Sequence, residues 1–238
     1  WWDHRNHQRV GLAVADHPLG PWQRVAAPLI PTTPGSWDHL ITACPTVARG
    51  PDGRYRLIYK GVADGPPPFG GNVRMGLAIA PHPAGPWEKQ DGNFFHTEGV
   101  QFPSDGNYLW FDGERYRAIV KDCGGHFQNR FRKALVLFES PDARQWRPTG
   151  PDPVLLPFEI QADDGRRIGP VSRLDQPHLI FDAHGAAVAL CLSVKEQPDD
   201  RNDDLAYTVQ VPLTTVTIRP GTEQLLPARQ VPVPGPGE

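Results

Sequence analysis

The stretch R-V-G-L-A-V-A-D-H-P-L-G-P-W at Arg9–Trp22 returns almost unchanged as R-M-G-L-A-I-A-P-H-P-A-G-P-W at Arg74–Trp87, 65 residues further along the chain. A near copy at a fixed offset indicates a repeat protein, and repeats of roughly 40 to 50 residues with several short strands are typical of propeller blades. The sequence therefore predicts blades arranged around an axis, and the middle of such a wheel usually binds something.

The composition fits an all-β globular protein. The chain has 238 residues, and its 24 glycines and 28 prolines lie between short apolar runs, as the turns of an all-β protein would. The net charge of -3 lacks the excess of basic residues that is typical of nucleic-acid-binding proteins. The sequence contains no run of 18 apolar residues and no signal-peptide pattern, so we expect a soluble protein without nucleic-acid or membrane partners. Compartment and oligomeric state stay open.

Neither the cysteines nor the histidines form a recognisable framework. Cys44, Cys123 and Cys191 are an odd number without paired spacing, which argues against disulfides and a zinc site. The nine histidines lack a ligand spacing such as H-x-x-x-H with a partner carboxylate. We therefore expect structural cysteines, no metal and no cofactor.

Three segments are predicted to be β-hairpins that form the front half of a blade. Gly53, Gly113 and Gly185 supply the positive φ that tight hairpin turns require, the first two as Asp-Gly pairs. The three hairpins are Pro45–Lys60, Asn107–Lys121 and Pro177–Lys195.

The back half of each blade ends in tryptophan. Arg9–Trp22 and Arg74–Trp87 show it clearly, and Ala134–Trp146 shows it more weakly. We expect all three indoles to be packing residues, because a blade must bury its faces against its neighbours. Together the halves predict one five-bladed β-propeller domain over residues 1–238, incomplete at the start: half a blade at 1–30, blades near 41–95, 105–150 and 174–215, and a tail at 216–238.

Acidic residues recur at the start of the predicted inner strands, which line the channel of a propeller. Aligning the front halves places Ala43-Cys44-Pro45, Asp105-Gly106-Asn107 and Asp175-Gln176-Pro177 at equivalent positions. The first of these lacks the carboxylate, but Asp38 lies shortly before it. Asp38, Asp105 and Asp175 are therefore catalytic candidates, although an aspartate before a strand often caps its own turn.

Carboxylates that converge in a pocket suit glycoside hydrolysis, in which one protonates the leaving oxygen and another activates water or attacks the sugar. His178 follows on an inner strand and is either an acid or a satisfied core histidine. Lys60 and Lys121 end second strands and are predicted to be solvated. The expected substrate-binding residues are Trp37, His39, His126 and Arg173, and Glu98 and Glu159 are reserve candidates for the acid.

The G-L-A-x-A...P-x-G-P-W back halves and the P-T-V-A-R-G-P-D-G-R-Y-R-L-I-Y strand pair resemble the five-bladed β-propeller glycoside hydrolases of families 43 and 117, over about residues 1–215. The resemblance implies an exo-acting, inverting glycosidase that takes the end of an oligosaccharide or polysaccharide chain. Asp105 and Asp175 match the family placement of the acids, Asp38 matches it loosely, and the family 117 pattern favours His178 as the acid.

Two departures from the family pattern keep other functions open. Cys44-Pro45 stands where Asp-Pro is expected, and the first inner strand, which usually carries the base, is not in this chain. The alternatives are a non-catalytic carbohydrate-binding propeller and a glycoside phosphorylase, which would need a basic phosphate pocket.

Overall fold

The computed structural model describes residues 7–67, 69–127, 132–151, 160–161, 165, 167–168, 171–196, 206–215 and 225–227. Within these residues every regular element is a β-strand, so the all-β prediction is confirmed. The chain divides into two compact units, one made of Trp1–Ala118 and Phe138–Thr149, the other of Ile119–Leu137 and Gly150–Glu238. No helix in the described part of the chain is long and apolar enough to cross a membrane.

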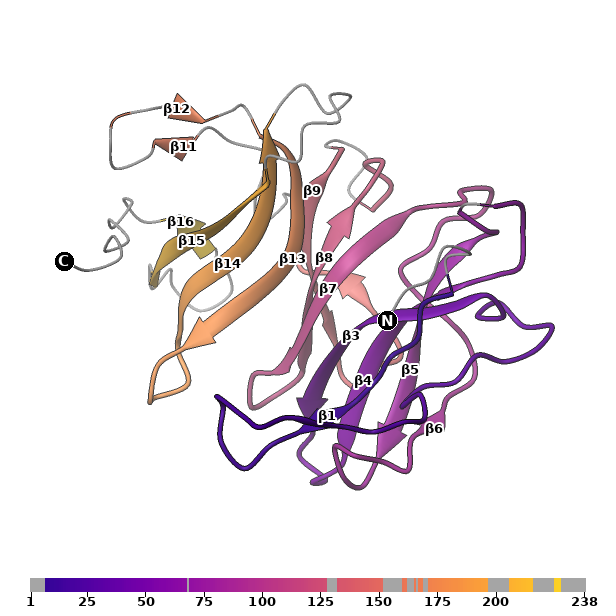
Figure 1. Cartoon of the computed structure of the whole chain (residues 1–238). Coiled ribbons are helices and arrows are strands. Elements are labelled where there is room, and N and C mark those ends of the chain that lie inside the picture. The colour runs from indigo at the N-terminus through magenta and orange to yellow at the C-terminus, as the bar shows by residue number, and fades with distance from the viewer. Residues whose placement is uncertain are drawn as a thin grey trace. The chain divides into compact units, whose positions relative to one another are not determined.

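Three sheets have four strands each, in which consecutive strands are neighbours (Figure 1). This order follows from the sequence, since tight turns allow each strand to fold back on the one before it. Gly53, Gly113 and Gly185 all have positive φ, as predicted for the hairpin turns. The sheets comprise β3 (Ile41–Arg49), β4 (Tyr55–Val62), β5 (Val73–Ala80) and β6 (Glu88–Lys89); β7 (Ser104–Phe111), β8 (Tyr116–Asp122), β9 (Ala134–Ser140) and β10 (Arg147–Pro148); and β13 (Val171–Phe181), β14 (Ala187–Glu196), β15 (Ala206–Thr215) and β16 (Leu225–Pro227).

Two further sheets have two strands each. They are β1 (Ala13–Val14) with β2 (Gln23–Arg24), and β11 (Ile160–Gln161) with β12 (Arg167–Ile168). Of the predicted tail at 216–238, the structure describes only residues 225–227, which form β16 and pair with β15.

The sequence repeat is also a repeat of backbone geometry. In the first copy Ala13 pairs with Arg24, and in the second Ala78 pairs with Lys89, both partners displaced by the same 65 residues. In each copy the turn contains a positive-φ glycine followed by a cis proline, Gly20-Pro21 and Gly85-Pro86. The two copies therefore fold into the same hairpin.

The two copies differ in what covers them. β5 pairs with β4 on one side and β6 on the other, whereas β1 pairs with β2 alone among the described residues. Trp87 packs against a buried cluster, but Trp22 is 59% exposed. The packing prediction is therefore wrong for Trp22, because the described part of the chain provides no second partner strand for β1. Trp146 packs against the rings of Phe94 and Phe95, as expected.

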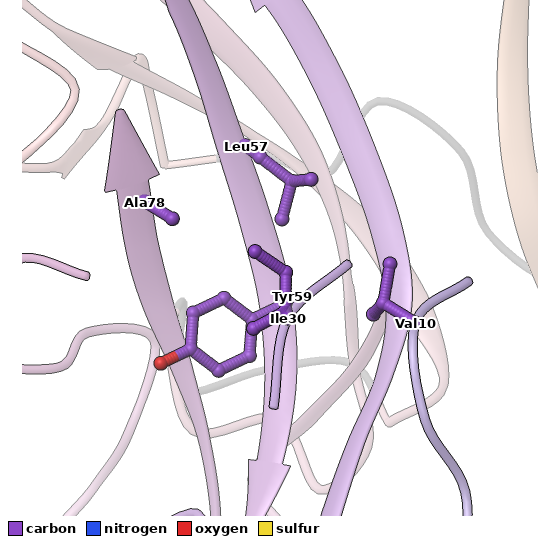
Figure 2. Packing of buried hydrophobic residues seen from close by; sticks show 5 residues of the cluster. All are labelled: Val10, Ile30, Leu57, Tyr59 and Ala78. Atoms are coloured by element: carbon purple, nitrogen blue, oxygen red, sulfur yellow. The ribbon is translucent and has the colours of Figure 1, made fainter. Parts of the chain in front are cut away.

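A buried cluster joins the first hairpin to the first four-stranded sheet. Figure 2 shows Val10, Ile30, Leu57, Tyr59 and Ala78, all at most 3% exposed. Burying large apolar side chains contributes about 1.5 to 3 kcal/mol each. Partly buried neighbours, Trp37 among them, pack against the cluster and complete it.

Candidate functional site

The inner strands β3, β7 and β13 each contain one residue with an unusual backbone conformation. Cys44, Gly106 and Gln176 have φ values of 48°, 47° and 51°, in the left-handed region that residues other than glycine seldom adopt. The pairing register shifts at the same point, between Ala43 and Thr46 in β3 and between Asp175 and His178 in β13. The common conformation confirms that these positions, aligned from sequence, are structurally equivalent.

Asp105 immediately precedes one of these positions and forms an ion pair across two sheets. The Nζ atom of Lys60, from β4, lies 3.0 Å from Oδ1 of Asp105, in β7. Burial lowers the pKa of Lys60, but the Asp105 carboxylate and the Cys44 thiol outweigh it, so that the pKa is raised above its ordinary value. Lys60 therefore stays protonated beside the acid.

Asp175 has the same kind of partner in the second unit. Lys121, from β8, donates a hydrogen bond from Nζ to Oδ1 of Asp175, in β13. Lys121 is only 8% exposed, and the side chain of Lys60 is also largely covered. The prediction that these lysines are solvated strand ends is therefore wrong. A signal was present in the sequence, because a lysine lies near the end of the second strand in both hairpins.

Asp38 has a different environment. It is 1% exposed, and its Oδ2 accepts hydrogen bonds from the hydroxyl of Tyr59 at 3.1 Å and from Nζ of Lys89 at 2.5 Å. Lys89 belongs to β6, the strand at the edge of the sheet opposite β3. Burial, together with the charge of Asp38, raises the pKa of Tyr59, so the phenol stays protonated and donates. These contacts favour a structural ion pair.

Trp37 packs against the same tyrosine. The rings of Trp37 and Tyr59 are stacked with centroids 5.6 Å apart. A Cβ atom added to Gly61 or Gly76 would lie 2.2 Å or 2.4 Å from the indole, so both glycines are required for its close approach. The indole therefore fills space beside β4 and β5. The sequence predicted a substrate contact for Trp37 and did not predict this packing role.

His39 lines a polar pocket of about 310 Å³ in the first unit. Its Nδ1 atom accepts a hydrogen bond from the backbone of Gly35, which leaves Nε2 as the donor of the neutral imidazole. Arg9, the first residue of the repeat, also lines the pocket and donates to the carbonyls of Gln8 and Leu40. The complete lining is His7, Arg9, Thr32, Pro34, His39, Leu40 and Asp64.

His126 lies in a loop that Asp122 organises. The buried carboxylate of Asp122 accepts hydrogen bonds from four successive backbone N–H groups, those of Gly124, Gly125, His126 and Phe127. A Cβ atom at Gly124 would lie 2.1 Å from Nε2 of His126, so the imidazole lies directly against this glycine. The sequence pattern D-C-G-G-H thus encodes an ordered turn, and residues 128–131 of the same loop lie outside the described part of the chain.

Arg173 and His178 lie on β13, on either side of Asp175, and both are exposed. The alternative of a core position for His178 is therefore wrong. Of the reserve candidates, Glu98 is exposed in a loop and Glu159 lies outside the described residues. Within the described part of the chain, no group of three or more His, Cys, Asp or Glu side chains is placed to hold a metal ion.

No protein-family model and no curated protein sequence matches the chain. Solved structures of glycoside hydrolases do match it in three dimensions, among them members of the five-bladed propeller families 43, 117 and 32. The fold is therefore that of the five-bladed β-propeller glycoside hydrolases, as the sequence predicts.

Three of these structures show the extent of the match. A thermostable family 43 glycoside hydrolase has a TM-score of 0.65 and 14% identity over 100% of this chain and 72% of its own. An α-L-arabinofuranosidase from Lactobacillus brevis has a TM-score of 0.58 and 14% identity, and the match covers 100% of this chain and 71% of the arabinofuranosidase. Zg3597, a family 117 glycoside hydrolase from Zobellia galactanivorans, has a TM-score of 0.51 and 18% identity, and the match covers 85% of this chain and 50% of Zg3597. The chain thus spans half the length of the family 117 protein.

Proposed function

We propose that the protein is a glycoside hydrolase that releases sugars from the end of an oligosaccharide or polysaccharide, with Asp105 and Asp175 as two of its working carboxylates. The observation that carries the proposal is the equivalence of the two residues. Each precedes a left-handed residue within the first strand of a four-stranded sheet, and each is paired with a lysine of the preceding four-stranded sheet. Repetition of a charged pair beside a left-handed residue favours function over a local cap.

Hydrolysis of a glycosidic bond needs a group that protonates the leaving oxygen and a group that activates water or attacks the sugar carbon. Carboxylates supply both roles when their surroundings differ. The fold neighbours support this chemistry, since they are glycoside hydrolases. We propose inversion at the anomeric carbon, on the family resemblance, with water as the attacking group.

The other candidates divide according to their contacts. His39 in its polar pocket, Arg173 on β13 and His126 on its ordered turn are proposed to bind sugar hydroxyls, and His178 is a proposed proton donor. Asp38 and Trp37 already have partners within the first sheet, namely Lys89 and Tyr59. Their contacts support stability more directly than catalysis.

The test is hydrolysis of a panel of aryl glycosides and short oligosaccharides by the wild type and by the Asp105→Asn and Asp175→Asn variants. Loss of a catalytic carboxylate should lower the kcat of the folded variant by about 100-fold or more. Asp112→Asn is the matched control, because Asp112 lies in the β7–β8 turn, where it pairs with Arg117. Full activity in both test variants would remove the assignment.

The stereochemical proposal has its own measurement. Proton NMR of the first-formed product distinguishes inversion from retention of the anomeric configuration. An inverted anomer supports the proposed mechanism, and a retained one contradicts it while leaving the hydrolase assignment in place.

A non-catalytic sugar-binding protein is the second candidate, and one observation favours it. At the position of Asp105 and Asp175, β3 carries Ala43, so the first four-stranded sheet contributes no carboxylate there. Glycan binding by calorimetry without turnover would support this alternative. Turnover that requires added phosphate would instead indicate a phosphorylase.

A further inference from the structure

The lysine–aspartate pairs have the same construction in both units. In each pair the lysine comes from the second strand of one four-stranded sheet and the aspartate from the first strand of the next. The residue after each aspartate is left-handed, with φ of 47° at Gly106 and 51° at Gln176. Two independent copies of one arrangement indicate that the pairing itself has a purpose.

Both lysines are mostly withdrawn from water, with side-chain exposures of 13% for Lys60 and 10% for Lys121. A buried ammonium group is costly unless an anion accompanies it. The pair therefore remains intact only while its aspartate is ionised, since protonation of the carboxyl would leave the cation without its counterion. The ammonium also donates a hydrogen bond that restricts the carboxylate to one orientation.

On this basis we infer that Lys60 and Lys121 are positioning residues that keep Asp105 and Asp175 oriented as carboxylates, so that neither aspartate is the proton donor of the reaction. Each is suited to activating water or to stabilising positive charge on the sugar. The donor must then be a third residue, whose environment keeps a proton available. This inference rests on the proposed hydrolase function for its catalytic consequence, but the charge state of the two aspartates can be tested without activity.

The charge state is measured by infrared spectroscopy on protein with ¹³C-labelled aspartate. The difference between wild type and Asp105→Asn isolates the Asp105 band, and Asp175→Asn does the same for Asp175. In mildly acidic buffer both bands should be those of ionised carboxylates. A protonated band for either residue in the wild type overturns the inference for that residue.

The positioning role is measured by kinetics of Lys60→Met, Lys60→Arg and the equivalent Lys121 variants. Removing the cation should lower kcat by about 10- to 100-fold with a smaller change in KM, because a misplaced group costs about that much. The acid limb of the pH–rate profile should move to higher pH, since the carboxylate loses its ammonium partner. Arginine keeps the charge and should restore much of the rate and the position of the acid limb.

Lys89→Met is the matched control, because Lys89, on the edge strand β6, also pairs with an aspartate, but this aspartate, Asp38, lies in the loop before β3. It should lower stability and leave the pH profile unchanged. If Lys60→Met behaves like Lys89→Met, with reduced stability and an unmoved acid limb, the positioning role is refuted. A wild type that hydrolyses no glycoside, with both aspartates ionised, refutes the proposed function but supports the inferred charge state.

Discussion

The Nζ atom of Lys60 lies 3.0 Å from Oδ1 of Asp105, although 45 residues separate them and they belong to different sheets. Lys121 and Asp175 repeat the contact across 54 residues. The aspartate on the first strand of one sheet therefore forms an ion pair with a lysine of the preceding sheet. A change in either strand should affect both stability and the candidate chemistry.

The close approach of Trp37 to β5 predicts a sharp contrast between two equivalent glycines. A Cβ atom at Gly76 would lie 2.4 Å from the indole, whereas one at Gly11, its counterpart in the repeat, would meet nothing within 4 Å. Gly76→Ala should lower the free energy of unfolding by about 1 to 3 kcal/mol through overpacking. Gly11→Ala should be nearly neutral. Urea denaturation of both variants tests this, and equal effects would contradict the packing found here.

A buried hydroxyl on β3 provides a second test. The Oγ1 atom of Thr42 donates to the carbonyl of Ile30 at 2.6 Å, and Ser104 donates in the same way to Phe95 at 2.7 Å. Thr42→Val keeps the shape but leaves the carbonyl unsatisfied, which should cost about 1 to 3 kcal/mol. Thr42→Ser keeps the donor and should cost less. Thermal unfolding of the two variants should rank them in that order, and the reverse order would exclude the hydrogen bond as the cause.

The turn between β3 and β4 should contribute to stability in a pH-dependent way. The hydrogen bonds of Arg56 lower the pKa of Asp52 from 3.8 to about 2, against a smaller opposing effect of burial. Because the folded pKa is below the unfolded one, the contribution is present above pH 3.8 and is lost as pH falls toward 2. Asp52→Asn should therefore be less stable than wild type near neutrality, and the difference should shrink in acid.

Denaturation midpoints measured across this pH range check the prediction for Asp52. Arg56→Gln removes the other partner and should abolish the same acid dependence. A stability difference that stays constant down to pH 2 would assign it to the turn conformation and not to the charge.

The contribution of Lys60 to folding stability should depend on pH with the opposite sign to that of Asp52. Its pKa is raised above 10.5 in the folded chain, so its contribution is complete below pH 10.5 and is lost as pH rises through the folded value. Asp105→Asn removes the main charge that raises the pKa, and leaves burial, which lowers it, opposed by Cys44. NMR titration of the Lys60 side chain should therefore show a lower midpoint in the variant. An unchanged midpoint would mean that the ion pair does not form in solution.

The pair of Asp38 and Lys89 should show strong energetic coupling. Lys89 lies 2.5 Å from a carboxylate that is almost fully buried, and removing either partner leaves the other poorly compensated. A double-mutant cycle with Asp38→Asn and Lys89→Met should give a coupling free energy of about 1 to 3 kcal/mol. Additive effects of the two substitutions would argue against the structural role and return Asp38 to the catalytic candidates.

Local sequence specifies much of the fold. Asp-Gly pairs require positive φ and so fix the hairpin turns at Gly53 and Gly113, and the repeated G-P-W turn fixes the same backbone at Gly20 and Gly85. The equivalence of Asp105 and Asp175 also follows from local sequence, because aligning the front halves on their opening Asn107 and Pro177 needs no tertiary information.

The partners of those residues required the folded chain. Lys60 and Lys121 read as solvated strand ends, since a terminal lysine is usually exposed, and only the approach of the next inner strand buries them. Trp22 and Trp87 occupy the same place in the repeat, yet one is exposed and the other packed, because only Trp87 belongs to a hairpin with further strands beside it.

The sequence by itself determined the blades, their turns and the positions of two equivalent acids, because these depend on backbone conformations encoded within a few residues. The tertiary structure alone decided that each acid is paired with a lysine of the preceding sheet and that the buried Asp38 pairs with Lys89 of β6. Ion pairs join residues about 50 positions apart, and no local pattern specifies which distant side chains meet when the sheets pack.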